Sequence, residues 1–198
     1  MSIEDITPFR PIVLRARYNG FTEKHLSAAR DLISRVVWNA GDESGPTAKS
    51  SIAVPIQPHQ HPAFRDFFTW YERIAEQVIE GHLGMNKTYE YRVVRSWVNQ
   101  HQKGDQTLEH HHGDSVLAMA AYLSVPNNSG CIEFRDPLDL ARSQVINDDS
   151  VVRKGWFRVP VQSGDVVMFP GWLVHRTEVS ESQWPRLVMS ANIQCPRF

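Results

Sequence analysis

The first 88 residues carry apolar side chains mostly at the three- and four-residue spacing of amphipathic helices. One strand is expected before the first helix, over residues 11–18, where apolar and polar positions begin to alternate. A first helix should start after Thr22, a residue type that often caps helix N-termini. A second helix should begin near Pro62 and end around Gly81, because proline suits the first turn of a helix and glycine its end.

The pattern changes after residue 88, where short apolar stretches alternate with turn residues. Strands are expected over residues 89–100, 110–114, 116–125, 131–134, 156–161, 165–169, 173–179 and 186–195. Many short strands separated by turns are typical of a β-sandwich or barrel. We therefore expect a mainly β protein with one domain, residues 1–198. Within it, residues 1–88 supply a strand and two supporting helices that pack on one sheet of a β core formed by residues 89–198.

The composition is that of an ordinary globular chain and excludes few functions. The chain has 198 residues, of which 41% are hydrophobic, and a net charge of -1, which argues against a general nucleic-acid-binding protein. Its two cysteines have neither CxxC nor zinc-finger spacing, so a disulfide framework is not expected. Without a basic and apolar leader pattern or a spanning apolar segment, we expect a cytoplasmic protein with no membrane partner.

Four of the nine histidines lie within residues 101–112, which suggests a metal site. In an extended strand alternate residues share a face, so His110, His112 and Asp114 would point the same way. His112 and Asp114 can then offer one nitrogen and one carboxylate ligand. His175, in an apolar stretch broken by proline and glycine, is the best third ligand. Two histidines and one carboxylate bind one face of Fe(II) and leave the other positions open.

The last expected strand adds a candidate anion-binding residue. Residues 186–193 alternate, so that one face carries Arg186, Val188, Ser190 and Asn192 and the other Leu187, Met189, Ala191 and Ile193. The planar guanidinium of an inward-facing arginine suits a carboxylate. If residues 180–185 form a turn, His175 lies opposite Ser190, and Arg186 is four residues further, about 13 Å at roughly 3.3 Å per residue. A short dicarboxylate could bridge metal and arginine.

Together these motifs resemble the 2-oxoglutarate–iron(II) oxygenase superfamily, and most nearly its short bacterial and phage members. The matching positions are Trp97, Asn99, Gly104, the histidines at 110–112, Ser115, Tyr122, the stretch from Phe169 to His175, Arg186, Ser190 and Asn192. The resemblance implies a double-stranded β-helix, or jelly roll, and an enzyme that uses Fe(II), O2 and the cosubstrate 2-oxoglutarate. The implied reaction oxidises a C–H bond, usually by hydroxylation, and releases succinate and CO2. A small molecule is the expected substrate, although a side chain is also open.

The resemblance also implies a role for each candidate residue. His112, Asp114 and His175 would be the iron ligands. Arg186, helped by Ser190, would bind the distal carboxylate of 2-oxoglutarate. Asn99 or Tyr122 would bind its near carboxylate or keto end.

Two other interpretations use the same residues. Gly104, His110 and His112 match the start of a cupin motif, which would make His110, His112 and His175 the ligands of a metalloenzyme without 2-oxoglutarate. The glutamate that this motif requires is absent, so Asp114 is preferred to His110. A non-catalytic jelly-roll binding module is the third possibility.

Overall fold

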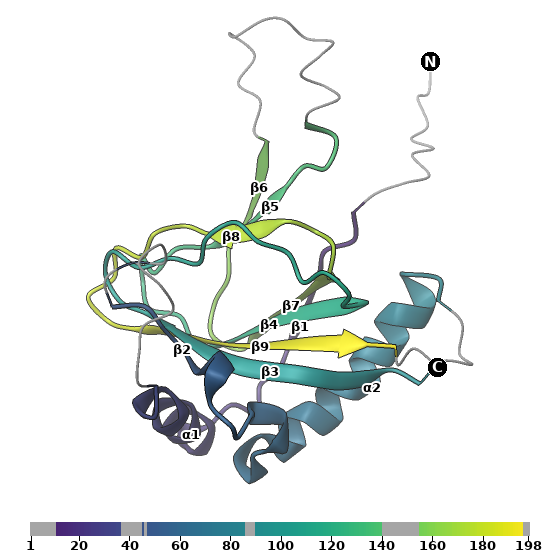
Figure 1. The fold of residues 1–198 in the computed structure, drawn as a ribbon. Helices are drawn as coiled ribbons and strands as arrows, with labels where there is room; N and C mark the ends of the chain where they lie inside the picture. The colour runs from purple at the N-terminus through teal and green to yellow at the C-terminus, as the bar shows by residue number, and fades with distance from the viewer. Residues whose placement is uncertain (1–10, 37–44, 46, 86–89, 140–154, 196–198) are drawn as a thin grey trace, which may run out of the picture.

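The computed structural model describes residues 11–36, 45, 47–85, 90–139 and 155–195 (Figure 1). Its strands form two antiparallel sheets, one in the order β1-β7-β4-β9-β3-β2 and the other in the order β6-β5-β8. The large sheet contains β1 (Leu14–Arg17), β2 (Lys49–Ser50), β3 (Arg92–His101), β4 (Leu117–Ser124), β7 (Asp165–Pro170) and β9 (Arg186–Gln194). The small sheet contains β5 (Ile132–Arg135), β6 (Trp156–Val159) and β8 (His175–Thr177).

Two helices, α1 (Glu23–Ser34) and α2 (Arg65–Gly81), cover the outer face of the large sheet (Figure 1). Thr22 is the N-cap of α1, as predicted, and its backbone N–H donates to His25 Nδ1 at 3.2 Å. The second helix begins after a single 3-10 turn over Pro62–Phe64. Buried helical residues such as Leu32, Phe67 and Tyr71 pack in one cluster with residues of β4, β7 and β9. No helix of the described residues is long and apolar enough to cross a bilayer.

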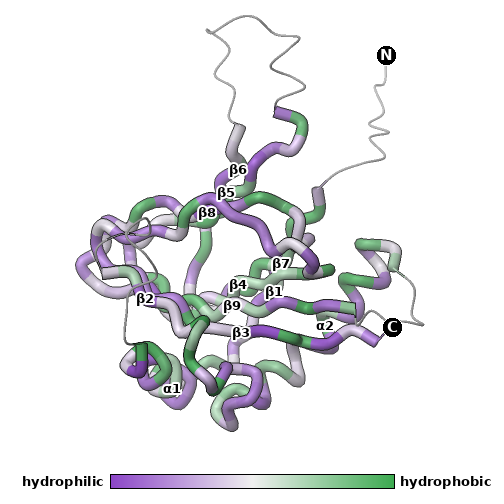
Figure 2. The backbone as a smooth tube through the Cα atoms, in the orientation of Figure 1, coloured by the Kyte–Doolittle hydropathy of each residue, from purple (hydrophilic) through white to green (hydrophobic). Residues whose placement is uncertain are grey.

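The inner face of the large sheet packs against the small sheet around a second, smaller apolar cluster. Alternate residues of β4 divide between the two clusters, because successive side chains of a strand point to opposite faces. Met119 and Ala121 face the helices, whereas Ala120 and Tyr122 face the small sheet. In Figure 2 the central strands β4 and β7 are mostly apolar, while β3 near the edge carries more polar residues. The predicted jelly-roll architecture with helices on one sheet is confirmed.

Two predictions about local structure are wrong. Residues 110–114 do not form a strand: only an isolated bridge joins His110 to His175. His175 also does not lie opposite Ser190, because β8 pairs with β5 in the small sheet and Ser190 pairs with Trp97 and Ala120. The chain after β8 crosses from the small sheet to the large one instead of folding into a hairpin, and it is held by hydrogen bonds to neighbouring loops.

Candidate active site

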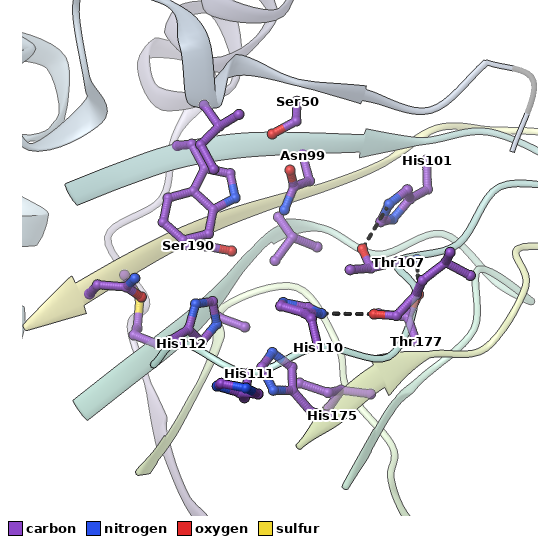
Figure 3. A pocket seen from close by; sticks show the side chains of 18 of the residues that line it. Ser50, Asn99, His101, Thr107, His110, His111, His112, His175, Thr177 and Ser190 are labelled. Atoms are coloured by element: carbon purple, nitrogen blue, oxygen red, sulfur yellow. Dashed lines mark hydrogen bonds between the residues drawn. The ribbon is translucent and has the colours of Figure 1, made fainter. Parts of the chain in front are cut away.

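A cavity of about 810 Å³ lies between the two sheets, and most of the predicted site residues line it. Its walls include Trp97, Asn99, His101, Thr107, His110, His112, Asp114, Tyr122, Phe169, His175, Thr177, Val188, Ser190 and Asn192. Figure 3 shows His110, His112 and His175 gathered on one side, across from Asn99 and Ser190 of the large sheet. Strands β3, β4 and β9 therefore form one wall, and β8 with the segment before β4 forms the other.

The three histidines each bring one possible ligand atom to a common point. These atoms of His110, His112 and His175 lie within 4.8 Å of one another. The ring centroids of His110 and His175 are 4.2 Å apart, and those of His112 and His175 are 5.0 Å apart. Phe169 lies against this group, with its ring 4.5 Å from that of His175. The arrangement can hold one divalent metal ion.

Burial keeps these imidazoles neutral and therefore able to donate a lone pair to a metal. It lowers the pKa of His175 to about 3 and that of His112 to about 4, with the neighbouring histidines acting in the same direction. Burial also lowers the pKa of His110, partly opposed by the hydrogen bond to the Leu108 carbonyl. Imidazole binds metal only in its neutral form, so the site needs no proton release near neutral pH.

Backbone contacts place His112 at the edge of the group. Its N–H donates to the Gly171 carbonyl at 2.7 Å, and its own carbonyl accepts from Ser115 N–H at 2.8 Å. The second bond closes a turn in which Gly113 has a positive φ of 38°. Asp114 follows in this turn, is exposed, and lies outside the group of mutually close ligand atoms, although it lines the cavity. The turn separates Asp114 from the face that His110 and His112 share.

Arg186 of β9 is completely buried and does not line the cavity itself, but it contacts His101, which does. Its guanidinium donates to Nδ1 of His101 at 2.8 Å and to the Gly130 carbonyl at 3.0 Å, and its Nε has no partner among the described residues. No described carboxylate forms an ion pair with it. A buried charge without an opposite charge is costly, so this side chain is suited to receive an anion.

The other predicted residues, Ser190, Asn99 and Tyr122, all line the cavity. Ser190 pairs with Trp97 across β3 and β9, Val188 pairs with Asn99, and Tyr122 of β4 is buried beside them. The sequence analysis missed His101, which lines the cavity and contacts Arg186. It could have been found by alternation, because it lies two residues after Asn99 and so faces the same way. Trp97, Thr107 and Thr177 were also missed as wall residues.

The part of the chain that supplies these residues matches a known family. Residues 95–192 match the family model described as "Putative 2OG-Fe(II) oxygenase", where 2OG is 2-oxoglutarate. The chain belongs to this oxygenase family. This match confirms, at the level of the family, the predicted use of iron, O2 and 2-oxoglutarate.

Several solved structures resemble the oxygenase over nearly its whole length. The SnoN epimerase from nogalamycin biosynthesis, solved with Fe3+, alpha ketoglutarate and nogalamycin RO, is 21% identical, with a TM-score of 0.65 over 94% of this chain and 80% of that chain. HygX from Streptomyces hygroscopicus, solved with nickel, 2-oxoglutarate and hygromycin B, is 14% identical, with a TM-score of 0.61 over 95% and 84%. A Pseudomonas putida prolyl-4-hydroxylase is 14% identical, with a TM-score of 0.59 over 94% of both chains. No curated protein matches significantly.

Proposed function

We propose that this oxygenase binds Fe(II) and 2-oxoglutarate in the cavity between its sheets and oxidises a C–H bond of a small molecule. The observation that carries the proposal is the group of neutral imidazoles within 4.8 Å of one another, inside the segment that matches the family. Imidazole nitrogens suit Fe(II), and a group on one side of the ion leaves positions for cosubstrate and O2. Bound iron would supply the activation of O2.

The metal ligands in this proposal are His112 and His175 with a third group, either Asp114 or His110. All four side chains line the cavity. The histidines are held neutral by burial, so each can donate a ring nitrogen without first losing a proton. The aromatic rings of Trp97 and Phe169 lie beside His112, with centroids 5.8 Å and 6.2 Å from that of its imidazole.

Arg186 is proposed to bind the distal carboxylate of 2-oxoglutarate. Its charge is buried, its described partners are a neutral histidine and a carbonyl, and its Nε is free to donate. A carboxylate that reaches this end of the cavity gains a charge-assisted hydrogen bond. Ser190, Asn99 and Tyr122 line the same cavity and are proposed to orient the rest of the cosubstrate.

A small-molecule substrate is supported by the size of the cavity. At about 810 Å³ it falls within the range of small-molecule sites, roughly 300–1,000 Å³, and can hold 2-oxoglutarate together with a second ligand. SnoN and HygX were solved with nogalamycin RO and hygromycin B, respectively, which supports the same class of substrate. A cytoplasmic location is proposed with it, in keeping with two free cysteines.

The test measures binding and turnover separately. Metal-free protein is loaded with Fe(II) under anaerobic conditions, and 2-oxoglutarate binding is measured by equilibrium dialysis. Oxygen is then admitted with a panel of metabolites, and succinate is quantified. We expect binding that requires Fe(II), and succinate release that increases with the right substrate. Loaded protein that neither binds 2-oxoglutarate nor forms succinate would contradict the proposal.

The cupin-like alternative makes a different prediction in the same assay. His110 lies with His112 and His175, which is the ligand set that this alternative needs. Oxidation of a substrate by Fe(II) and O2 at a rate independent of 2-oxoglutarate would favour it.

A further inference from the structure

We propose that the metal ion is held by three imidazoles, those of His110, His112 and His175, and that Asp114 is not a ligand. This inference rests on the proposed function, which supplies the metal, and it decides between the two candidates for the third ligand. It replaces the carboxylate of a two-histidine, one-carboxylate site by a neutral nitrogen donor.

Backbone hydrogen bonds place His110 directly opposite His175. The N–H of each residue donates to the carbonyl of the other, both at 3.0 Å. Residues that exchange both hydrogen bonds in an antiparallel pair are directly opposite, and their side chains leave the same face. The side chain of His110 therefore leaves the backbone on the same face as that of His175 because of two main-chain hydrogen bonds.

The ring of His110 is also oriented as a metal-binding imidazole is. Nδ1 of His110 lies 2.7 Å from the carbonyl oxygen of Leu108, and Nδ1 of His175 lies 3.0 Å from that of Leu173. A carbonyl can only accept, so both Nδ1 atoms carry the hydrogen and both Nε2 atoms present a lone pair. Metal-bound histidines commonly donate their other N–H to a backbone carbonyl in this way. His110 and His175 make the same contact, with the carbonyl two residues earlier in each case.

Asp114 lacks each of these features. The turn closed by Ser115 N–H and the His112 carbonyl, 2.8 Å apart, interrupts the alternation that would carry Asp114 onto the face of His110 and His112. Its side chain is exposed, and its carboxylate oxygens do not join the three imidazoles within the 4.8 Å group of described ligand atoms. Asp114 is at the rim of the cavity, where a carboxylate is solvated.

Three neutral ligands change the charge of the site. The protein then contributes no negative charge to a divalent ion, and the ion's own charge dominates the local field. 2-Oxoglutarate would bring one carboxylate to the ion, because its distal carboxylate is proposed to pair with Arg186, so one positive charge would remain at the metal.

The test compares metal affinity in five variants of the metal-free protein, with Co(II) as the probe under anaerobic conditions. We expect His110→Ala, His112→Ala and His175→Ala each to weaken Co(II) binding at least tenfold, and Asp114→Asn to change it less than twofold. His82→Ala is the control, because His82 is an exposed histidine at the end of α2, does not line the cavity, and should leave the affinity unchanged. A tenfold loss in Asp114→Asn with unchanged binding in His110→Ala overturns the proposal.

A second measurement does not depend on the folding of the variants. In a crystal structure of the Co(II)-loaded wild-type protein we expect Nε2 of all three histidines on the ion. An Asp114 oxygen on the ion with His110 outside its coordination sphere overturns the ligand set. Succinate release by the wild type, measured separately, then still tests the proposed function, so the two can fail independently.

Discussion

Arg186 is the largest side chain that the described structure buries completely, and its interactions are with uncharged groups. His101 accepts from its guanidinium, and the opposite ring nitrogen, Nε2, lies 3.1 Å from the Thr107 hydroxyl. His101 must therefore carry its hydrogen on Nε2, so it is neutral and donates to Thr107. The buried guanidinium thus has hydrogen-bond partners, but no described carboxylate balances its charge. This favours the binding of an anion at this end of the cavity.

Replacing Arg186 by lysine tests this role without removing the charge. Lysine lacks the planar fork and cannot keep both the His101 and the Gly130 contacts while it binds a carboxylate. We expect Arg186→Lys to weaken 2-oxoglutarate binding to the Fe(II)-loaded protein about tenfold, or about 1.4 kcal/mol, and to spare metal binding. Isothermal titration measures both. Arg176→Lys is the control, because Arg176 pairs with Glu133 outside the cavity. Equal cosubstrate affinity in the two variants would show that Arg186 does not bind 2-oxoglutarate.

The pH dependence of stability should report the buried His101. Burial, and then the nearby Arg186 charge, lower its pKa from 6.5 to about 3 in the folded protein. Between these values the unfolded chain binds a proton that folded His101 does not, so stability is complete above pH 6.5 and falls as the pH falls towards 3. Its share of the slope is at most about 1.4 kcal/mol per pH unit.

The variant His101→Gln isolates that contribution. A glutamine carbonyl can accept from Arg186 and its amide can donate to Thr107, but the side chain does not titrate. Urea unfolding of metal-free protein between pH 7 and 4 should show a shallower loss of stability in the variant than in the wild type. Parallel pH profiles would mean that His101 is protonated in the folded state.

At the residue scale, the sequence predicted the composition of the site better than its geometry. The alternation in β9 correctly placed Ser190 and Asn192 on the cavity face and Leu187 and Met189 on the helix face. Alternation also predicted that Asp114 shares the face of His112, but residues 110–114 form no strand and a turn at Gly113 interrupts the alternation. The turn at Gly113 follows a tertiary hydrogen bond from His112 N–H to the Gly171 carbonyl, which no local pattern reveals.

At the scale of elements, the contact between the 112–115 turn and the end of β7 positions His112. A Cβ on Gly171 would overlap the backbone carbonyl and side chain of Ser115. The only residue that lets the two segments approach this closely is glycine. The predicted strand break at Pro170 and Gly171 therefore has a function in the fold: it brings the carbonyl of Gly171 within 2.7 Å of the N–H of His112.

Gly171→Ala should consequently displace the turn, because a backbone atom cannot move aside as a flexible side chain can. We expect the variant to bind Co(II) about tenfold more weakly and to unfold at a lower temperature, with a cost of about 1–3 kcal/mol. Gly81→Ala is the control: a Cβ there meets no neighbouring atom within 4 Å. This second change should be neutral or slightly stabilising. Unchanged metal affinity in Gly171→Ala would show that the turn does not position His112.

The order of the elements was predictable, but their pairing was not. Periodicity indicated both helices and nearly every strand, because the spacing of apolar residues follows from the faces that an element buries. It contains no information on which sheet a short strand joins. β8 has three residues, and its place beside β5 is set by backbone bonds to loops that are distant in sequence.

At the scale of the molecule, a bound ion would link the small sheet to the segment that leads into the large sheet. His175 belongs to the small sheet, while His110 and His112 precede β4 of the large sheet. A ligand that binds only the folded protein stabilises it by about 2.7 kcal/mol at a hundredfold excess over its dissociation constant. We expect Co(II) to raise the melting temperature, and 2-oxoglutarate to raise it further only when Co(II) is present.

Thermal unfolding under anaerobic conditions measures both shifts. Mg(II) is the control ion, because it prefers oxygen ligands and should bind poorly to a group of imidazoles. Equal shifts with Mg(II) and Co(II) would indicate weak, unspecific binding of cations. A shift with 2-oxoglutarate alone would mean that the diacid binds without the metal.

The two apolar clusters differ in their relation to the cavity between the sheets. The cluster between the helices and the large sheet is aliphatic and aromatic throughout, and Met119 is its only buried member that lines the cavity. The cavity wall also includes exposed side chains, such as Arg95 and Glu109, that belong to neither cluster. These side chains can be exchanged at little cost to folding, so a new substrate preference could evolve, or be engineered, through changes in this exposed part of the wall.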